Sequence, residues 1–517
     1  MPPKRPFKKI APDRKPRILI VTPEITYLPP DMGNMANIMT AKAGGLADVS
    51  ASLVAALFEL GADVHVALPH YRRMFHMEVG RLINDELRVY KSRMPDSRIH
   101  LAEDRCFYYR ETVYSGYADE NPRLALAFQR EVVNNIIPTV QPDLIHCNDW
   151  MTGLVPAAAR RMGIPSLFTV HNIHTQHVTL AKTEDLGIDA AEFWQYLYFK
   201  RPPHNYEETR AANPVDLLTS GVFAAHFINT VSETFLDEIC RGWFEFVPDV
   251  FRNEVINKRN AGCAAGILNA PDATYDPALD PALKMCYDAA GHAAGKAANK
   301  ASFQRKMGLF EDPNAPLFFW PSRLDPIQKG PQLLTDILYR VVNKHRSHNL
   351  QIAIVANGPH QRHFHDIVRL HDLYGRVAVC DFDESLSRRG YAASDFILMP
   401  SLFEPCGLPQ MIGPIYGSLP VAHDTGGLHD TVAQLDEGAG TGNGFLFNVF
   451  DSSGLLWAMD CAMDFWARPA DGTPPPQRRA AQISRVMRES KARFNHGVCA
   501  QSYIGIYEKM LNRALVK

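Results

Sequence analysis

The sequence has little that would suit a membrane span, a disulfide framework or a nucleic-acid surface. Its nine cysteines are scattered and odd in number, and none forms a C-x-x-C pair, which favours reduced thiols. No apolar run approaches the roughly 18 residues of a membrane span. The formal net charge is −2, so the chain lacks the basic excess of a nucleic-acid binder. We therefore expect a cytoplasmic protein with no membrane or nucleic-acid partner.

The chain is long and apolar enough to form more than one core. It has 517 residues, of which 46% are hydrophobic, and a prior of roughly 150 residues per domain suggests about three domains at most. Residues 1–16 are rich in basic side chains but have no apolar stretch typical of a secretion signal. We expect them to be a disordered basic tail, with contact to an acidic surface or a targeting role as the alternative.

Strand and helix patterns alternate through residues 17–270. The β-branched runs at 17–24 (RILIVTPE) and 63–70 (DVHVALPH) flank a stretch with apolar residues at helical spacing, 46–60. Further apolar runs continue the alternation: DLIHC, SLFTVH and FINTVS. This order is typical of a parallel, doubly wound sheet. It predicts an N-terminal Rossmann-like domain.

The alternation restarts after a polar segment rich in Pro and Asp, residues 271–283, which we expect to be a linker. Five more strand candidates follow, which predict a second Rossmann-like domain at 284–498, and a helical pattern at 499–517 is expected to pack back toward the first domain. The predicted fold class is therefore α/β, with two doubly wound domains facing a central cleft. Ligands of open α/β sheets bind beyond the carboxyl ends of the strands.

A glycine-rich motif, KAGGLADV, follows the first strand and a long loop. Glycines let a ligand approach the backbone, a helix start offers free N–H groups, and a lysine adds a full charge. Lys42, Gly44 and Gly45 therefore suit a phosphate or a closely fitting sugar. A plain turn into a core helix is the alternative for this fragment alone.

Polar and aromatic residues follow two other strands of the first domain. HCNDW and TVHN supply Asp149, Trp150, His171 and Asn172. We expect these side chains to face the cleft, where sugar hydroxyls would suit them. A structural histidine is the alternative for His171.

Two motifs of the second domain carry charge just after strands. SRLDPIQKG places Arg323 and Lys329 where a leaving diphosphate would need cations, although solvated loop charges are the alternative. In FEPCGLPQM, Gly407 and Leu408 are expected to begin a helix whose N–H groups point at the same anion. Glu404 then lies at the cleft wall, or it caps that helix.

Eight motifs in order resemble those of bacterial glycogen synthases and plant starch synthases. They are KAGGLADV, HCNDW, TVHN, TVSETF, GILNAPD, SRLDPIQKG, FEPCGLPQM and TGGLHDTV, and the similarity runs from about residue 17 to the C-terminus. The resemblance implies the GT-B fold and retaining transfer of glucose from a nucleotide diphosphate to an α-1,4-glucan. The implied partners are ADP-glucose or UDP-glucose and a glycogen-like or starch-like acceptor.

Matching positions extend the resemblance to individual residues. Glu404 aligns with the family's essential glutamate, His171 with a histidine near the transferred glucose, and Asp149 with the aspartate of an H-x-x-D-W-type motif. Trp150 and Asn172 are expected in the cleft or at the acceptor. The residues implied in donor binding are Lys42, Gly44, Gly45, Asp48, Asn269, Arg323, Lys329, Cys406, Gly407 and Leu408.

The sequence departs from the family pattern in four places. Pro409 replaces the usual Thr or Ser after E-P-C-G-L, which removes a hydroxyl and a backbone N–H. The loop at 25–41 is longer than usual and is a candidate lid or acceptor surface. HNIHTQH lacks the usual Tyr-Gln-Gly after H-N, and SRLDPIQKG has one extra residue before Lys329.

No metal or cofactor is expected. The DFD of residues 381–383 mimics a metal-binding D-x-D, but by resemblance it lies near the nucleotide base. The histidines of HNIHTQH and HQRHFHD lack the spacing of a zinc site. Lys42, Arg323 and Lys329 would take the place of a divalent ion.

The leading interpretation is a retaining α-1,4-glucan synthase, an enzyme. A glucan-binding or regulatory homologue with weak transfer is the first alternative, motivated by Pro409 and the altered H-N loop. A related transferase with a changed donor or acceptor is the second.

Overall fold

The computed structural model describes residues 14–33, 35–76, 98–117, 119–467 and 475–515. The chain divides into two compact units: unit 1 comprises residues 1–231, 236–267 and 496–517, and unit 2 comprises 232–235 and 268–495. Most of the basic tail predicted at 1–16 lies outside the described residues. At its end, the Arg14 side chain forms an ion pair of 2.7 Å with Asp143 in unit 1.

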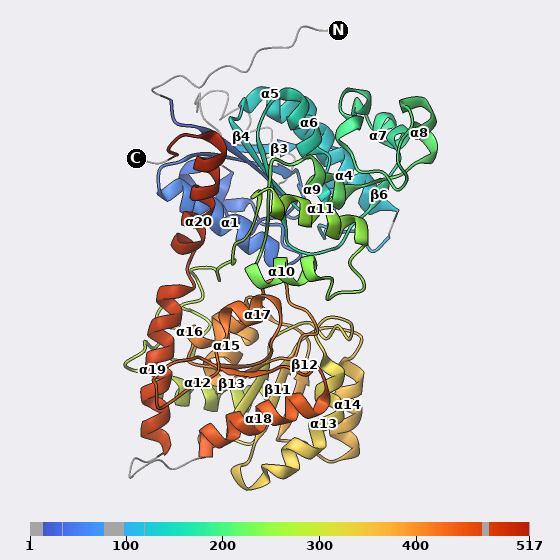
Figure 1. Ribbon diagram of the computed structural model, residues 1–517. Helices are drawn as coiled ribbons and strands as arrows, with labels where there is room; N and C mark the ends of the chain where they lie inside the picture. The colour runs from blue at the N-terminus through green and yellow to red at the C-terminus, as the bar shows by residue number, and fades with distance from the viewer. Residues whose placement is uncertain (1–13, 34, 77–97, 118, 468–474, 516–517) are drawn as a thin grey trace. The chain divides into compact units, whose positions relative to one another are not determined.

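Unit 1 is built on a seven-stranded sheet of the order β3-β2-β1-β4-β5-β8-β9 (Figure 1). Neighbouring strands of this sheet pair in parallel; in register, Leu19 lies beside His65 on one side and Ile145 on the other. The strands are β1 (Arg17–Val21), β2 (Asp63–Pro69), β3 (Ile99–Ala102), β4 (Leu144–Asn148), β5 (Ser166–Val170), β8 (Phe227–Thr230) and β9 (Ala264–Gly266).

Helices accompany this sheet as the alternating pattern predicts. The main ones are α1 (Gly45–Glu59), α4 (Glu120–Glu131), α6 (Val155–Met162), α9 (Leu217–Ala224), α10 (Glu233–Arg241), α11 (Asp249–Asn260) and α20 (His496–Leu511). The first residues of α10, 233–235, belong to unit 2. The C-terminal helix α20 packs on α1. The hydroxyl of Tyr507 lies 2.8 Å from Nδ1 of the buried His146, so the end of the chain helps to complete the core of unit 1.

Unit 2 contains a six-stranded parallel sheet of the order β12-β11-β10-β13-β14-β15. Its strands are β10 (Leu317–Trp320), β11 (Gln351–Val355), β12 (Val377–Cys380), β13 (Phe396–Met399), β14 (Leu419–His423) and β15 (Phe445–Phe447). Its helices are α12 (His292–Met307), α13 (Pro331–Lys344), α14 (Gln361–Leu370), α15 (Glu384–Ala393), α16 (Pro409–Ile415), α17 (Gly426–Thr431), α18 (Ser452–Ala467) and α19 (Pro475–Arg493).

Both faces of the unit 2 sheet are buried, which explains why its strands are continuously apolar. Phe318 and Trp320 point into a core shared with α13, α14 and α18. Leu317 and Phe319 point into a second core with α12, α15 and α16. Successive side chains of a strand alternate between faces, so a sheet covered on both sides needs an apolar residue at every position.

The segment expected to link the domains, 271–283, packs against unit 2. Asp280 is buried, accepts a hydrogen bond of 2.5 Å from the Tyr416 hydroxyl, and lies 3.4 Å from Arg388. The division between the units falls at Ile267 and Leu268 instead. Polar composition indicated a linker, but tertiary contacts satisfy these polar groups within a packed unit.

The long loop at 25–41 is tied down at both ends. Ile25 and Ala41 exchange two backbone hydrogen bonds of 2.9 and 2.7 Å, and the loop residues Leu28, Met32 and Met39 are buried. Its described residues therefore form a packed part of unit 1, which argues against a freely moving lid.

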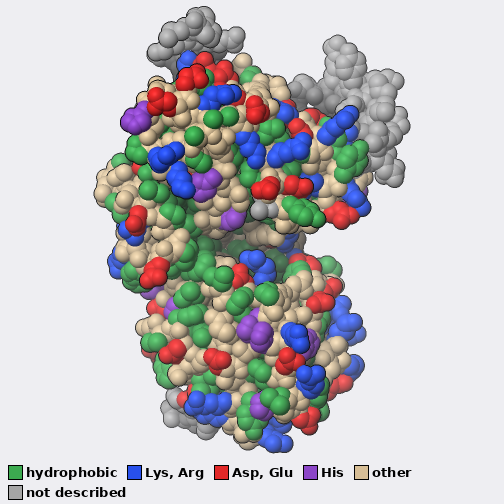
Figure 2. All heavy atoms as spheres, turned by 90° about the vertical axis from the view of Figure 1, so that its right-hand side faces the viewer, with side chains coloured by type: hydrophobic (Ala, Val, Ile, Leu, Met, Phe, Trp, Pro, Cys, Tyr) green, Lys and Arg blue, Asp and Glu red, His purple; other side chains and the backbone are tan. Residues whose placement is uncertain are grey.

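The described surface shows no broad region of one charge on the face drawn in Figure 2. Lys and Arg side chains alternate with Asp and Glu there. No described helix combines the length and apolar character that crossing a membrane requires.

Candidate active site

The order of the unit 2 strands reverses between β10 and β13, and the loops after these two strands carry the predicted charges. Such a reversal opens a crevice at the carboxyl ends of the two strands. The loop after β10 contains Lys329, and the loop after β13 contains Glu404. Their side chains meet: Lys329 Nζ lies 2.6 Å from Glu404 Oε2.

Backbone contacts hold these two loops together. Leu402 N–H donates to Gln328 O at 2.8 Å. Gly330 has a φ of 67°, and a Cβ added there would lie 2.1 Å from Pro400 O, so only glycine allows this approach. The close contact places Lys329 beside Glu404 despite the extra residue in SRLDPIQKG.

The Lys329–Glu404 pair is largely shielded from solvent. The Lys329 side chain is 12% exposed and the Glu404 side chain 6%. The Ser401 hydroxyl donates a further hydrogen bond of 3.0 Å to Glu404 Oε2. Burying two charges is costly unless each is paired and hydrogen-bonded, so this site holds a carboxylate and an ammonium ready for a polar ligand.

Arg323 differs from Lys329 in its surroundings. It follows the same strand but is exposed, and no hydrogen bond or ion pair joins its side chain to another described residue. Leu324, fully buried, anchors the loop beside it. The guanidinium is therefore available to an anion.

The helix expected to begin at Gly407 and Leu408 begins two residues later. Leu408 is the N-cap of α16, Pro409 is its first residue, and Gly407 lies before it with a φ of 73°. Proline is favoured at this position because its φ is already helical. Pro409 has no N–H, and the N–H groups of Met411 and Ile412 both donate to Leu408 O at 2.9 Å. This helix start therefore offers fewer donors to an anion than the sequence pattern predicted.

The motif TGGLHDTV supports the Glu404 loop. Gly427 N–H donates to Glu404 O at 2.8 Å, and a Cβ at Gly427 would lie 2.0 Å from Cys406 O. Cys406 is buried. The second glycine of the motif is thus required by the close approach of the loop 403–408.

Asn269 carries a buried polar atom without a partner. Its side chain is 7% exposed, and its Oδ1 accepts no hydrogen bond from another described residue. An unsatisfied buried acceptor is costly. A ligand hydroxyl or amide would remove that cost.

The order of the unit 1 strands reverses between β1 and β4. The carboxylate of Glu24, after β1, accepts hydrogen bonds from the N–H groups of Ala43 and Gly44 at 2.6 and 3.0 Å. Lys42 forms an ion pair of 2.9 Å with Asp48 in the first turn of α1. Gly44 is the N-cap of α1, Gly45 its first residue, and a Cβ at Gly44 would meet nothing within 4 Å.

Asp149, after β4, organises the second predicted group of unit 1. It has a φ of 57° and accepts hydrogen bonds from His171 N–H at 2.8 Å and from Asn172 Nδ2 at 3.2 Å. His171 Nε2 lies 2.9 Å from Asn148 Oδ1. The structure therefore brings Asp149, His171 and Asn172 together.

Burial shifts the pKa of both Asp149 and His171. It raises the pKa of Asp149 to about 7, against the hydrogen bonds that favour the carboxylate. It lowers the pKa of His171 to about 3, so this imidazole is neutral near pH 7. A neutral imidazole can donate one hydrogen bond and accept another.

Trp150 does not provide the exposed ring that we expected. It is 3% exposed, and its ring centroid lies 6.4 Å from that of Tyr114 and 5.7 Å from that of His174. Trp150 is the first residue of η4 (Trp150–Thr152), whose three residues are all buried, so the ring packs within unit 1. Its expected place at the acceptor is therefore not supported by an open face.

Two residues joined to these groups were not among the sequence candidates. Tyr114 donates a hydrogen bond of 3.4 Å to Glu24 Oε1, and burial raises the pKa of both side chains. Glu24 lies three residues after the end of β1, a position near a strand end that the sequence pattern already indicated. Tyr114 lies in an irregular segment and had no such signal.

The altered H-N loop has a structural role. Thr175 Oγ1 donates to Asp216 Oδ1 at 3.0 Å and accepts from Leu218 N–H at 3.1 Å, which ties the loop to the start of α9.

The DFD motif is likewise structural. Asp383 caps α15 by accepting from Leu386 N–H at 2.6 Å, and Asp381 accepts from Gln361 Nε2 at 3.0 Å. Within the described ranges, no group of three or more His, Cys, Asp or Glu side chains could hold a metal ion.

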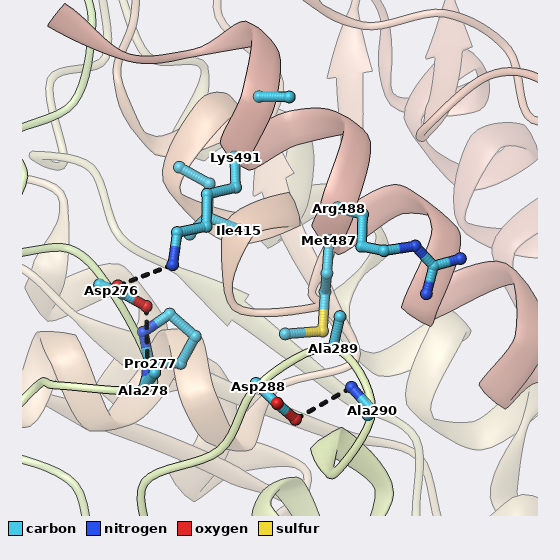
Figure 3. A pocket seen from close by; sticks show the side chains of 11 residues that line it. Asp276, Pro277, Ala278, Asp288, Ala289, Ala290, Ile415, Met487, Arg488 and Lys491 are labelled. Carbon is cyan, nitrogen blue, oxygen red and sulfur yellow. Dashed lines mark hydrogen bonds and ion pairs between the residues drawn. The ribbon is translucent and has the colours of Figure 1, made fainter.

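A cavity of about 510 Å³ lies elsewhere in unit 2 (Figure 3). Its lining includes Asp276, Ile415, Met487 and Lys491, and Lys491 closes one side through its ion pair of 2.8 Å with Asp276. None of the predicted site residues lines it.

Replacing Asp149 by Asn tests whether burial raises the pKa of this carboxyl group in the folded protein. In the native protein Asp149 keeps its proton up to about pH 7, whereas an unfolded Asp ionises near pH 4. The unfolded chain therefore binds fewer protons between these values, and this group's contribution to stability falls as pH rises, by at most roughly 1.4 kcal/mol per pH unit. We expect the free energy of unfolding of Asp149→Asn, measured with urea at pH 4.5 and pH 7, to lack this fall with rising pH.

Comparison with wild type isolates Asp149, because His171 has an opposing pH dependence in both proteins. Asp189→Asn, an exposed carboxylate in the same unit, is the control and should leave the slope unchanged. Equal slopes in Asp149→Asn and wild type would contradict the raised pKa.

Comparisons with known proteins point to a single family over most of the chain. A family model of the starch synthase catalytic domain matches residues 17–248, and a model of group 1 glycosyl transferases matches 315–464. Glycogen synthase of Bacillus subtilis is 30% identical over 495 residues, covering 91% of this chain and 95% of that protein. Glycogen synthase of Syntrophotalea carbinolica is 32% identical, covering 88% and 95%.

A solved structure shares the fold. The catalytic domain of starch synthase IV from Arabidopsis thaliana, bound to ADP and acarbose, superposes with a TM-score of 0.75 at 24% identity, covering 97% of this chain and all of that one. The two parallel α/β units and the similarity over most of the chain lead to one conclusion: the protein belongs to the glycogen synthase and starch synthase family and has the GT-B fold.

Proposed function

We propose that the protein is a cytoplasmic retaining glucosyltransferase that adds glucose from ADP-glucose or UDP-glucose to the non-reducing end of an α-1,4-glucan. The observation that carries the proposal is the shielded Lys329–Glu404 pair at the strand reversal of unit 2, 2.6 Å between Nζ and Oε2. The relatives named glycogen synthase support the substrate class. The ADP in the starch synthase IV structure makes ADP-glucose the first donor to test.

The leaving group sets the first chemical demand. When the anomeric bond breaks, negative charge grows on the diphosphate, and fixed positive groups stabilise it. Arg323, exposed and unpaired among the described residues, and Lys329 supply such charge in unit 2. Lys42 is assigned to the same anion by the family resemblance, and the proposed reaction needs no divalent ion.

The sugar sets the second demand. As the bond breaks, the ring becomes oxocarbenium-like, and a nearby carboxylate favours its positive charge. Glu404, held by Lys329 and Ser401, is the assigned carboxylate. Retention by a covalent intermediate and retention by reaction on one face are both compatible with this role.

Asp149, His171 and Asn172 are proposed to contact sugar hydroxyls. The neutral His171 and the amide of Asn172 are suited to uncharged hydroxyl groups. Burial makes Asp149 a partly protonated carboxyl near pH 7. We assign to these groups the binding and orientation of the sugar. We assign the stabilisation of the charges that develop in the reaction to unit 2.

A glucan-binding or regulatory homologue is the second candidate. Pro409 favours it, because the first residue of α16 has no N–H to offer a phosphate. Loss of one hydrogen bond to a charged group would cost about 1.5–3 kcal/mol of donor affinity. The charged pair remains intact, so we rank transfer first.

A donor assay tests the proposal. The full chain is incubated with glycogen and either ADP-[¹⁴C]glucose or UDP-[¹⁴C]glucose, with and without EDTA. We expect label in the polymer with at least one donor, released by an α-1,4-specific glucosidase and unaffected by EDTA. Glycogen binding without incorporated label from either donor would favour the regulatory homologue, and transfer only from another nucleotide sugar would indicate a changed donor.

A further inference from the structure

Asn148, the last residue of β4, links the end of β1 to His171. Its Nδ2 donates to the carbonyl oxygen of Val21, the last residue of β1, at 3.2 Å. Its Oδ1 lies 2.9 Å from Nε2 of His171, the first residue after β5. Strand β4 lies between β1 and β5 in the sheet, and Asn148 is only 4% exposed. The amide is therefore held between two partners in the interior of unit 1.

These two partners determine how the amide is turned. A carbonyl oxygen can only accept a hydrogen bond, so the end of the amide that faces Val21 must be the donor, Nδ2. The other end, Oδ1, then faces His171, and an amide oxygen can only accept. Nε2 of His171 therefore carries a proton and donates it to Asn148.

The neutral state of the ring determines the second nitrogen. Burial lowers the pKa of His171 to about 3, so near pH 7 the imidazole has a single proton, which is the one on Nε2. Nδ1 then has a lone pair and forms no hydrogen bond with the described part of the chain. His171 is partly exposed, unlike Asn148. The ring therefore offers a ligand one hydrogen-bond acceptor and no second donor.

The titratable neighbours of His171 are compatible with this state. Asp149 accepts from the backbone N–H of His171 and does not contact the ring nitrogens. His146, on the same strand as Asn148, is also neutral near pH 7, because burial lowers its pKa to about 3. The contact that selects the tautomer of His171 is therefore the one with Asn148.

We propose that Asn148 is a positioning residue that keeps His171 in its Nε2–H tautomer, so that Nδ1 accepts a hydrogen bond from a sugar hydroxyl. This inference rests on the proposed function, in which His171 contacts the sugar. A hydroxyl group can donate to Nδ1, whereas an ether oxygen or a carboxylate would meet a lone pair. The tautomer therefore selects a ligand with a hydroxyl donor at this position.

Ring ¹⁵N NMR of the full chain tests the tautomer directly. The protein is labelled with ring-¹⁵N histidine in a deuterated background, and the His171→Gln variant identifies the His171 signals by their loss. Long-range ¹H–¹⁵N spectra distinguish the nitrogens, because Nε2 correlates strongly with both ring C–H protons and Nδ1 with only one. Near pH 7 we expect Nε2 at the shift of a protonated nitrogen and Nδ1 at that of an unprotonated one. A proton on Nδ1 would overturn the inference.

Asn148→Leu removes the amide oxygen and fills a similar volume. A buried N–H without an acceptor is costly, so we expect the proton of His171 to move partly to Nδ1 and the two nitrogen shifts to converge. Asn134→Leu is the matched control, because Asn134 is exposed and donates to Gly187 O at 2.9 Å. It should leave both shifts unchanged. Unchanged shifts in Asn148→Leu would show that Asn148 does not position the ring.

Asn148→Asp provides a second variant in case the first does not fold. The carboxylate keeps an acceptor for Nε2 and adds a negative charge, which favours the imidazolium. We expect Nε2 of His171 to stay protonated and Nδ1 to take up a proton at a higher pH than in wild type. A titration of Nδ1 identical to that of wild type would contradict the contact.

Kinetics connect the tautomer to the sugar. We expect kcat/KM for the donor to fall about threefold to tenfold in Asn148→Leu, the value of one hydrogen bond between neutral groups, and to match wild type in Asn134→Leu. Donor analogues that each lack one glucose hydroxyl identify the partner of Nδ1. The analogue without that hydroxyl should lose less in Asn148→Leu than in wild type. Equal losses in both proteins for every analogue would overturn the contact with the sugar.

Failure of the proposed function would look different. A wild-type protein that transfers no glucose still gives the NMR comparison of Asn148→Leu with Asn134→Leu. A protonated Nε2 that is lost only in Asn148→Leu would then support the role of Asn148 in holding His171, while the absence of transfer would count against the proposed function alone.

Discussion

Replacing Glu404 by Gln is expected to lower kcat by at least about a hundredfold, with little change in the KM for glycogen. The amide keeps the shape of the side chain but removes the charge that favours an oxocarbenium-like ring. It also leaves Lys329 without its counter-ion at 2.6 Å. The loss should therefore appear in the chemical step. Initial rates with saturating donor and glycogen measure it.

The control for charge removal is Glu437→Gln. Glu437 forms an ion pair of 2.9 Å with Arg478 in the same unit and is 26% exposed, so the substitution removes a comparable pair outside the site. We expect near-normal kcat from this variant. For Glu404→Gln, thermal unfolding should show a loss of about 1–3 kcal/mol, too small to unfold a typical domain. Turnover within threefold of wild type would contradict the role of Glu404.

Replacing Lys329 by Met is expected to lower kcat/KM for the donor by about tenfold to a hundredfold, the value of one hydrogen bond to a charged group. The thioether chain fills much of the same volume but has no positive charge for the leaving diphosphate. Among the described residues, it also leaves the largely buried Glu404 carboxylate with only the Ser401 hydroxyl as a side-chain donor. The KM for glycogen should change little, since no acceptor contact is assigned to Lys329.

Lys344→Met is the matched control, because Lys344 forms an ion pair of 2.7 Å with Asp460 but is 51% exposed. Exposed pairs contribute only about 0–1 kcal/mol, so its kinetics should match wild type. The double variant Lys329→Met/Glu404→Gln adds a sharper criterion. If the pair acts as one unit, the fold-loss of kcat/KM in the double variant is smaller than the product of the fold-losses in the two single variants. Strict multiplication of the two effects would show that Lys329 and Glu404 act independently.

The location of the charges relative to the strands could be predicted from local patterns. Apolar runs with buried faces mark β10 and β13, and the polar residues that follow must lie at the carboxyl edge of a parallel sheet. Lys329 and Glu404 were therefore candidates before their contact was visible. Their separation of 75 positions along the chain meant that no local pattern could state whether they touch.

Trp150 and the segment 271–283 show where local patterns misled. Trp150 follows a strand next to Asp149, yet it turns inward because Tyr114 and His174 provide aromatic neighbours from distant segments. Residues 271–283 are polar and rich in proline, yet Asp280 is buried because Tyr416 and Arg388 satisfy its carboxylate. Composition reports what a residue prefers on average, and a specific partner can reverse that preference.

The sequence by itself predicted the alternation of strands and helices, the family motifs and the charged loop residues, since each depends on neighbours within a few positions. Folding decided which of those residues meet: the ion pair of Lys329 with Glu404, the Glu24 carboxylate on the N–H groups of Ala43 and Gly44, and the proton that burial keeps on Asp149. These properties depend on desolvation and on distances of about 3 Å between remote segments, which only a packed structure sets.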